Sequence, residues 1–136
     1  MEYQEFTSRT QQASQLMKAL RWKEAEVCLY KLYLSDISDF DKSNACATLA
    51  VVYDRMGNTE EALSWFDKGI DIEQTYSRYE VSEKKSQFLA QLGRRNEAVA
   101  IYEALIKQPY VGEAEKERMR KTIQSLLVGQ TTHIWK

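Results

Sequence analysis

The sequence has few residues that interrupt helices and few that support chemistry at one site. Its 136 residues include one proline, five glycines, two cysteines and one histidine. Proline and glycine disfavour helix interiors most strongly, so their scarcity permits long helices. The lone His133 and the two cysteines, Cys28 and Cys46, have no spacing typical of a metal site. We expect both thiols to be reduced and buried within helices rather than joined in a disulfide.

The sequence also lacks an excess of charge of one sign and any long apolar run. It carries 19 basic and 20 acidic side chains, for a formal net charge of −1. Without a basic stripe to neutralise phosphates, nucleic acid is not an expected partner. No run reaches the roughly 18 apolar residues that a membrane span requires, and the first residues lack the basic-then-apolar order of a secretory signal. We therefore expect a cytoplasmic protein that does not bind membranes.

A skeleton of apolar and small residues recurs with a period in the mid-thirties. Its clearest copy runs from Leu49 to Ile70, and weaker copies lie on either side. The alanines Ala25, Ala62 and Ala98 mark equivalent positions that are 37 and 36 residues apart. A regular period of this length is typical of stacked helical repeats.

Each copy of the skeleton has the pattern of two consecutive helices. Apolar residues recur at i, i+3, i+4 and i+7 between Leu49 and Met56. Gly57 and Gly93 are predicted to end the first helix of their copies in a left-handed conformation. Asn58 and Asn96 are predicted to cap the second helix. No run alternates apolar and polar residues, so we predict an all-α fold.

The pattern predicts about seven helices in a single domain, residues 1–136. The helices are expected near residues 5–20, 22–35, 43–56, 59–74, 78–92, 95–108 and 112–128. The repeats are expected at about residues 6–40, 43–76 and 79–110, followed by a capping helix at 112–128 and a tail at 129–136. Gly129 is expected to end the last helix. The side chains predicted to be buried are Leu16, Leu49, Tyr53, Ala62, Phe66, Leu89, Tyr102 and Ile123.

These residues resemble the tetratricopeptide repeat family, whose unit is a 34-residue helix pair. The segment Leu49–Ile70 matches well, whereas Ser86–Leu105 and Ala13–Leu32 match less closely. The periods exceed 34 by two or three residues, and the proline that usually closes a unit is present only as Pro109. The resemblance implies a right-handed solenoid of antiparallel helix hairpins. It also implies protein binding, since the family consists mostly of scaffolds, adaptors and chaperones.

Within that family, some members bind the acidic C-terminal tails of heat-shock chaperones through a clamp of basic and amide side chains. The matching positions here hold Thr10, Ser14, Thr48, Glu80 and Lys84. Only Lys84 is of the required type, and Glu80 has the same sign as the ligand. We do not expect binding of such tails.

The resemblance places a groove for a partner along the first helix of each repeat. In this register the partner-binding residues are Thr10, Ser14, Met17, Asn44, Ala47, Val51, Arg55, Glu83, Gln87 and Gln91. Amide side chains there would bind a peptide backbone, and Ala47 and Val51 would leave apolar room. The alternatives are a merely solvated face, or an interface on the second-helix side built from exposed aromatic residues. The aromatic residues outside the core set are Tyr30, Tyr33, Phe40, Trp65, Tyr76 and Tyr110.

No motif for catalysis, a cofactor or a metal is present. The acidic cluster Asp36, Asp39 and Asp41 lacks the glycine and glutamate of an EF-hand and is expected to cap a helix or lie in a solvated loop. We therefore predict a non-enzymatic adaptor that binds a peptide or helical segment of another protein. The alternatives are a small dedicated chaperone of the secretion-system type and a scaffold that self-associates weakly. For the tail, with Ile134 and Trp135, fraying, docking within the chain and docking on a neighbour all stay open.

Overall fold

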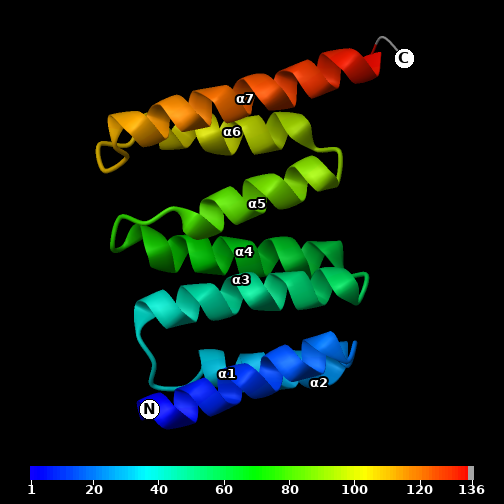
Figure 1. Ribbon diagram of the computed structural model, residues 1–136, viewed down its shortest axis with the longest axis vertical. Helices are drawn as coiled ribbons and strands as arrows, with labels where there is room; N and C mark the ends of the chain where they lie inside the picture. Colours follow the sequence, from blue (N-terminus) through cyan, green and yellow to red (C-terminus); the bar gives the residue numbers. More distant parts are fainter. Residues whose placement is uncertain (135–136) are drawn as a thin grey trace. The chain divides into compact units, whose positions relative to one another are not determined.

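The computed structural model describes residues 1–134, and the side chains of residues 1–128. Over these residues the regular structure consists of seven α-helices without a strand, which confirms the all-α prediction (Figure 1). The helices are α1 (Tyr3–Lys18), α2 (Trp22–Tyr33), α3 (Asp39–Arg55), α4 (Thr59–Gln74), α5 (Glu80–Gln91), α6 (Arg95–Leu105) and α7 (Glu113–Ile134).

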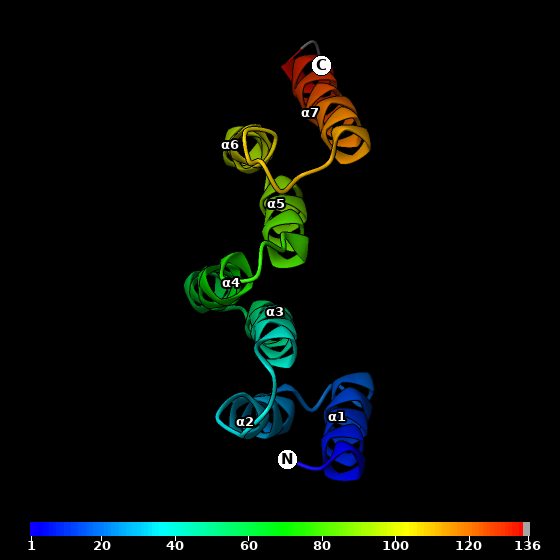
Figure 2. The same ribbon diagram turned by 90° about the vertical axis from the view of Figure 1, so that its left-hand side faces the viewer.

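The contacts divide the chain into two compact units, Met1–Val81 and Ser82–Lys136. The first unit contains α1 to α4, and consecutive helices pack against each other throughout it. Within this unit α1 and α3 lie on one side, and α2 and α4 lie on the other (Figure 2). The second unit contains most of α5 together with α6 and α7, and α6 packs against α7.

Three turns between helices repeat the same backbone conformation. Leu20, Gly57 and Gly93 have positive φ values of 59°, 81° and 81°. In each turn the amide of this residue donates to the carbonyl three residues back, and the next amide donates to the carbonyl five residues back. This pair of bonds is a Schellman motif, which satisfies carbonyls at the end of a helix. The three residues are 37 and 36 positions apart, so the backbone follows the period of the sequence.

Small residues lie where paired helices approach most closely. The three marker alanines, Ala25, Ala62 and Ala98, are fully buried, as predicted for Ala62. Between α3 and α4 the space is tighter still, because a Cβ built on Gly69 would lie 3.1 Å from the Cβ of Cys46. The chain therefore brings α3 and α4 together through residues with little or no side chain.

The helix starts agree with the sequence analysis in one repeat and not in another. Asn58 caps α4, since its Oδ1 accepts from the amide of Glu61 at 3.2 Å. The prediction for Asn96 is wrong, because α6 begins at Arg95 and Arg94 is its N-cap residue. The turn at Gly93 determines this start, and it leaves Asn96 inside the first helical turn.

Helix α3 begins earlier than predicted, at Asp39 instead of residue 43. Ser38 is its N-cap, and the Ser38 Oγ accepts from the amide of Asp41 at 3.1 Å. Asp39 and Asp41 lie in the first turn, where carboxylates complement the positive end of the helix dipole. These two members of the acidic cluster therefore stabilise a helix end, as the capping alternative predicts.

The expected end of the last helix is also wrong. Helix α7 continues through Gly129 and ends at Ile134. A single glycine inside a helix costs only about 1 kcal/mol relative to alanine, and no proline follows it. The side chain of Ile134 and the whole of Trp135 lie outside the described residues. The hypotheses about docking of the tail concern these two side chains.

The predicted core is confirmed in part. Leu49, Phe66, Leu89 and Tyr102 are buried, whereas Leu16, Tyr53 and Ile123 are only half-buried. Both thiols are free, and they differ in environment: Cys46 is buried and Cys28 is half-buried. Burial raises the pKa of each thiol, that of Cys46 to about 11, so both are protonated at neutral pH.

Candidate protein-binding surfaces

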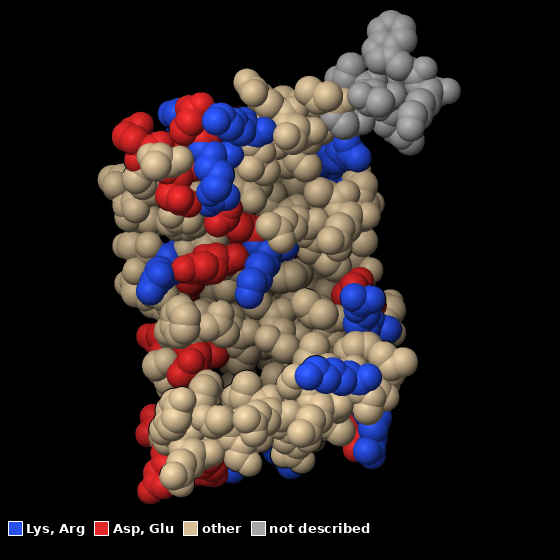
Figure 3. All heavy atoms as spheres, viewed as in Figure 1, with Lys and Arg blue, Asp and Glu red and all other residues tan. Residues whose placement is uncertain are grey.

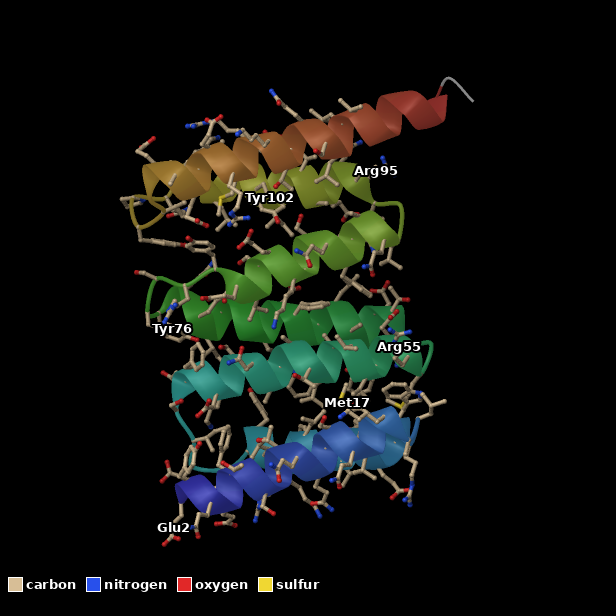
Figure 4. The ribbon with its side chains drawn as sticks, viewed as in Figure 1. Glu2, Met17, Arg55, Tyr76, Arg95 and Tyr102 are labelled. Atoms are coloured by element: carbon tan, nitrogen blue, oxygen red, sulfur yellow. The ribbon has the colours of Figure 1, made fainter. Side chains whose placement is uncertain are left out.

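The first unit brings six of the predicted partner-binding residues onto α1 and α3. Along each helix the intervals are three, four or seven residues, which places side chains on one face. The two helices that carry these stripes, α1 and α3, lie on the same side of the unit (Figure 2). Met17 and Arg55 lie near the same end of these two helices (Figure 4). We define the α1/α3 face as Thr10, Ser14, Met17, Asn44, Val51 and Arg55.

The α1/α3 face offers an apolar side chain between polar groups that are not engaged. Val51 is 40% exposed although it is aliphatic. Among the described residues, the Asn44 amide and the Arg55 guanidinium form no hydrogen bond or ion pair. The surface over α1 and α3 is largely uncharged in the view of Figure 3. Such a surface can accept an apolar side chain and the polar backbone of a bound segment.

Two predicted partner-binding residues are not available to a partner. Ala47 is only 3% exposed. Helix α3 packs against both α2 and α4, so most of its circumference is covered. The prediction from the family register that Ala47 lies at a surface is therefore wrong. Glu83 lies in the second unit, where its Oε1 accepts from Arg118 at 2.7 Å and from the Tyr102 hydroxyl at 3.3 Å. Its carboxylate is therefore engaged within the protein.

The other predicted residues of the second unit are Gln87 and Gln91, both exposed on α5. The nearby charges on this unit belong to a network that joins α5, α6 and α7. Arg118 forms ion pairs with Glu115 at 2.6 Å and with Glu83. The hydroxyl of Tyr102 donates to the same Glu83 (Figure 4). Burial, followed by the neighbouring Glu83, raises the pKa of Tyr102 to about 12. This network joins the three helices of the unit through side-chain contacts.

The aromatic alternative is only partly supported. Tyr30 and Tyr33 of α2 pack edge-on against Trp65 of α4, with ring centroids 5.9 and 5.1 Å apart. Trp65 is buried, and the ammonium of Lys68 lies 4.0 Å from its ring centroid. These rings therefore pack between consecutive hairpins, as we expected for most of the aromatic set. Tyr76 likewise has an internal partner, since its hydroxyl lies 2.7 Å from the Ser43 hydroxyl.

A cleft between α1 and α2 was not predicted from the sequence. Its volume is about 560 Å³. We define the α1/α2 cleft by its lining residues, which are Arg9, Gln12, Leu16, Lys23, Glu24, Val27, Cys28 and Lys31. Val27 is aliphatic, yet its side chain is 42% exposed, because it lies opposite the buried stripe of α2. An apolar residue on the outer face of an amphipathic helix is the signal that would have identified this surface.

Neither a metal centre nor a membrane span is found in the described part of the chain. No group of three or more His, Cys, Asp or Glu side chains among those residues is arranged to hold a metal ion. No described helix is both long enough and apolar enough to cross a membrane.

Comparison with protein families gives one match. Residues 11–94 match the family described as a domain of unknown function, DUF6340. The chain belongs to this family. The matched residues make up more than half of the chain, begin within α1 and end just after Gly93. The DUF6340 region therefore includes the left-handed turns at Leu20, Gly57 and Gly93, most of the α1/α2 cleft and nearly all of the α1/α3 face. No curated protein matches the chain.

Proposed function

We propose that the protein is a tetratricopeptide-like adaptor that binds a segment of another protein on its α1/α3 face. The observation that carries the proposal is the exposed Val51 between the unpaired polar ends of Asn44 and Arg55. The repeated left-handed turns support the resemblance to helical repeats, since they recur with the sequence period. We further propose that the hairpins form a right-handed solenoid, and that the protein binds partners without catalysing a reaction.

The chemistry of the α1/α3 face suggests what it binds. Covering Val51 with an apolar side chain gains about 25 cal/mol per Å² of buried surface. The Asn44 amide has both donors and an acceptor, so it can bind a peptide N–H and a carbonyl together. The Arg55 guanidinium donates to carbonyl or carboxylate oxygens. The bound segment is therefore one that presents an apolar side chain beside free backbone groups or an acidic residue.

The balance of polar and apolar groups favours an adaptor over a dedicated chaperone. A chaperone that shields a long apolar segment needs a continuous apolar surface. The α1/α3 face has one exposed aliphatic side chain, Val51, and the polar side chains of Thr10, Ser14 and Asn44, which suits a short segment with its own hydrogen-bonding groups.

A photocrosslinking experiment tests the proposed function. The photoreactive residue p-benzoylphenylalanine replaces Ser14 in one variant and Ser8 in another; both serines are exposed on α1. Six residues correspond to about 240° of helix rotation, so Ser8 lies on another face. In a lysate of cells that express the protein, we expect the Ser14 variant to crosslink to a partner that the Ser8 variant does not capture. Identical crosslinks from both variants would rule out the α1/α3 face as the binding site.

A further inference from the structure

The α1/α2 cleft corresponds to a surface that is covered elsewhere in the same unit. Leu16 and Cys28 line the cleft, and the residues 37 positions later are Tyr53 and Trp65. The period of 37 residues also relates the marker Ala25 to Ala62 and the left-handed Leu20 to Gly57. Tyr53 and Trp65 therefore occupy the same places on the second hairpin as Leu16 and Cys28 on the first.

On the second hairpin, helix α2 lies over this surface. The Tyr53 hydroxyl donates to the Glu26 Oε1 at 2.9 Å. The Trp65 ring packs against Tyr30 and Tyr33, with ring centroids 5.9 and 5.1 Å apart. The second hairpin thus has a face that accepts a helix. On the first hairpin that face is the α1/α2 cleft, and no described helix covers it.

Leu20 adds an independent observation at the turn that joins the two helices of the cleft. It is 71% exposed and has a φ of 59°, a conformation that side chains other than glycine rarely adopt. The equivalent residues, Gly57 and Gly93, adopt this conformation without a side-chain penalty. An exposed leucine here is unfavourable both for its conformation and for its contact with water.

The charges around the cleft indicate the sign of the partner. Its lining includes Arg9, Lys23 and Lys31 but only one carboxylate, Glu24. Three of these side chains are already paired with residues outside the lining: Glu24 with Arg21 at 2.6 Å, Arg9 with Glu5 at 2.7 Å and Lys23 with Glu26 at 3.3 Å. Among the described residues Lys31 forms no ion pair. The cleft therefore combines apolar side chains with one cation that is not neutralised, Lys31, which complements an acidic side chain of a partner.

We propose that the α1/α2 cleft binds an amphipathic α-helix of another protein, with acidic residues beside its apolar stripe. This helix lies in the cleft as α2 lies over α3 and α4. Its apolar side chains contact Leu16 and Val27, and one of its carboxylates contacts Lys31. The cleft is a second interaction surface, separate from the α1/α3 face, so the proposal does not depend on the function proposed for that face.

Two designed helical peptides test the proposal with the whole protein. Both carry leucine at i, i+4, i+7 and i+11; the flanking residues are glutamate in the acidic peptide and lysine in the basic one. In fluorescence anisotropy titrations we expect the acidic peptide to bind at least about tenfold more tightly than the basic one. Val27→Glu should weaken acidic-peptide binding by about tenfold or more, and Lys31→Glu should remove the preference between the peptides.

Val51→Glu on the α1/α3 face is the matched control, because it introduces the same side chain on the other surface. It should leave peptide binding unchanged, so failure of one surface is distinguishable from failure of the other. Circular dichroism of each variant confirms that the fold is retained. Failure of the acidic peptide to bind, equal affinity for both peptides, or binding insensitive to Val27→Glu would each overturn the proposal. Dimerisation abolished by Val27→Glu would identify a second copy as the occupant instead, and would also overturn it.

Discussion

Leu20, Gly57 and Gly93 occupy the same backbone position in three turns, and only Leu20 has a side chain. A left-handed conformation costs a residue other than glycine about 1–2 kcal/mol. We therefore predict that Leu20→Gly raises the free energy of unfolding by about 1 kcal/mol. Gly57→Ala should lower it by about 1 kcal/mol; a Cβ at Gly57 meets no neighbour within 4 Å, so the cost is conformational. Urea denaturation followed by circular dichroism measures both changes. Destabilisation by Leu20→Gly would show that Leu20 stabilises the fold.

Ala62 tests the packing of the repeat at the level of one side chain. It is fully buried between helices, so a larger residue must displace its neighbours. Ala62→Trp should lower the free energy of unfolding by about 3 kcal/mol or more. Inserting extra methylene groups into a packed core typically costs about 1–3 kcal/mol, and an indole ring is larger than these insertions. Ala100→Trp is the matched control, since Ala100 is exposed on α6. Equal melting temperatures for the two variants would contradict the helix packing described here.

At the scale of elements, two tyrosines join neighbouring helices through carboxylates. Tyr53 of α3 donates to Glu26 of α2, and Tyr102 of α6 donates to Glu83 of α5. In each case burial is the largest cause and the carboxylate contributes, and together they raise the tyrosine pKa to about 12. The pKa of a tyrosine in an unfolded chain is about 10. Folding therefore favours the protonated phenol.

This difference predicts how stability depends on pH. The contribution of each tyrosine is fully present below pH 10 and is lost as the pH rises from about 10 through 12. Tyr53→Phe and Tyr102→Phe should reduce this alkaline loss, and each should cost about 1 kcal/mol at neutral pH. Urea midpoints measured from pH 7 to pH 12 provide the comparison. Tyr3→Phe, at an exposed tyrosine, should behave as the wild type. A parallel loss in all four proteins would contradict this account.

The sequence was sufficient to predict the helices and the turns at Gly57 and Gly93, because these depend on local periodicity and on backbone conformation. It did not predict the true cap of α6 or the continuation of α7 through Gly129. Those ends depend on small energies of about 1 kcal/mol, which the hydrogen bonds of neighbouring turns outweigh. Leu20 was missed as a left-handed residue because leucine gives no local signal for that conformation.

The candidate surfaces were predicted less completely than the helices. Family register predicted the residues of the α1/α3 face on two helices that lie on the same side of the first unit, but it also included Ala47, which is buried, and Glu83, which is engaged with Arg118. Whether Ala47 is accessible depends on how two neighbouring helices cover α3, and the state of Glu83 depends on Arg118, which lies 35 residues later. The α1/α2 cleft was not predicted, because it is a helix-hairpin face that no described helix covers. Sequence periodicity shows which faces are apolar but not which of them pack against another helix.

At the scale of the whole molecule, α7 is expected to be essential for the second unit. Met119 of α7 is fully buried, and Arg118 of α7 binds Glu83 of α5. Deleting residues 112–136 should expose the apolar side of α6 and leave Glu83 without its cation. We expect lost helicity and aggregation in size-exclusion chromatography, beyond what the deleted length accounts for. A shortened protein that stays monomeric and unfolds at the same urea concentration would contradict this role of α7.

We propose above all that the first unit binds another protein through the α1/α3 face. Affinity capture from a lysate of the expressing cells, quantified by mass spectrometry, tests it with three proteins: the wild type, Val51→Glu and the matched control Val128→Glu. Val128 is 63% exposed on α7, so its replacement should be tolerated. We predict that one partner is retained by the wild type and by Val128→Glu, and falls about tenfold or more with Val51→Glu. Recovery of the same proteins in the same amounts by all three would contradict the claim.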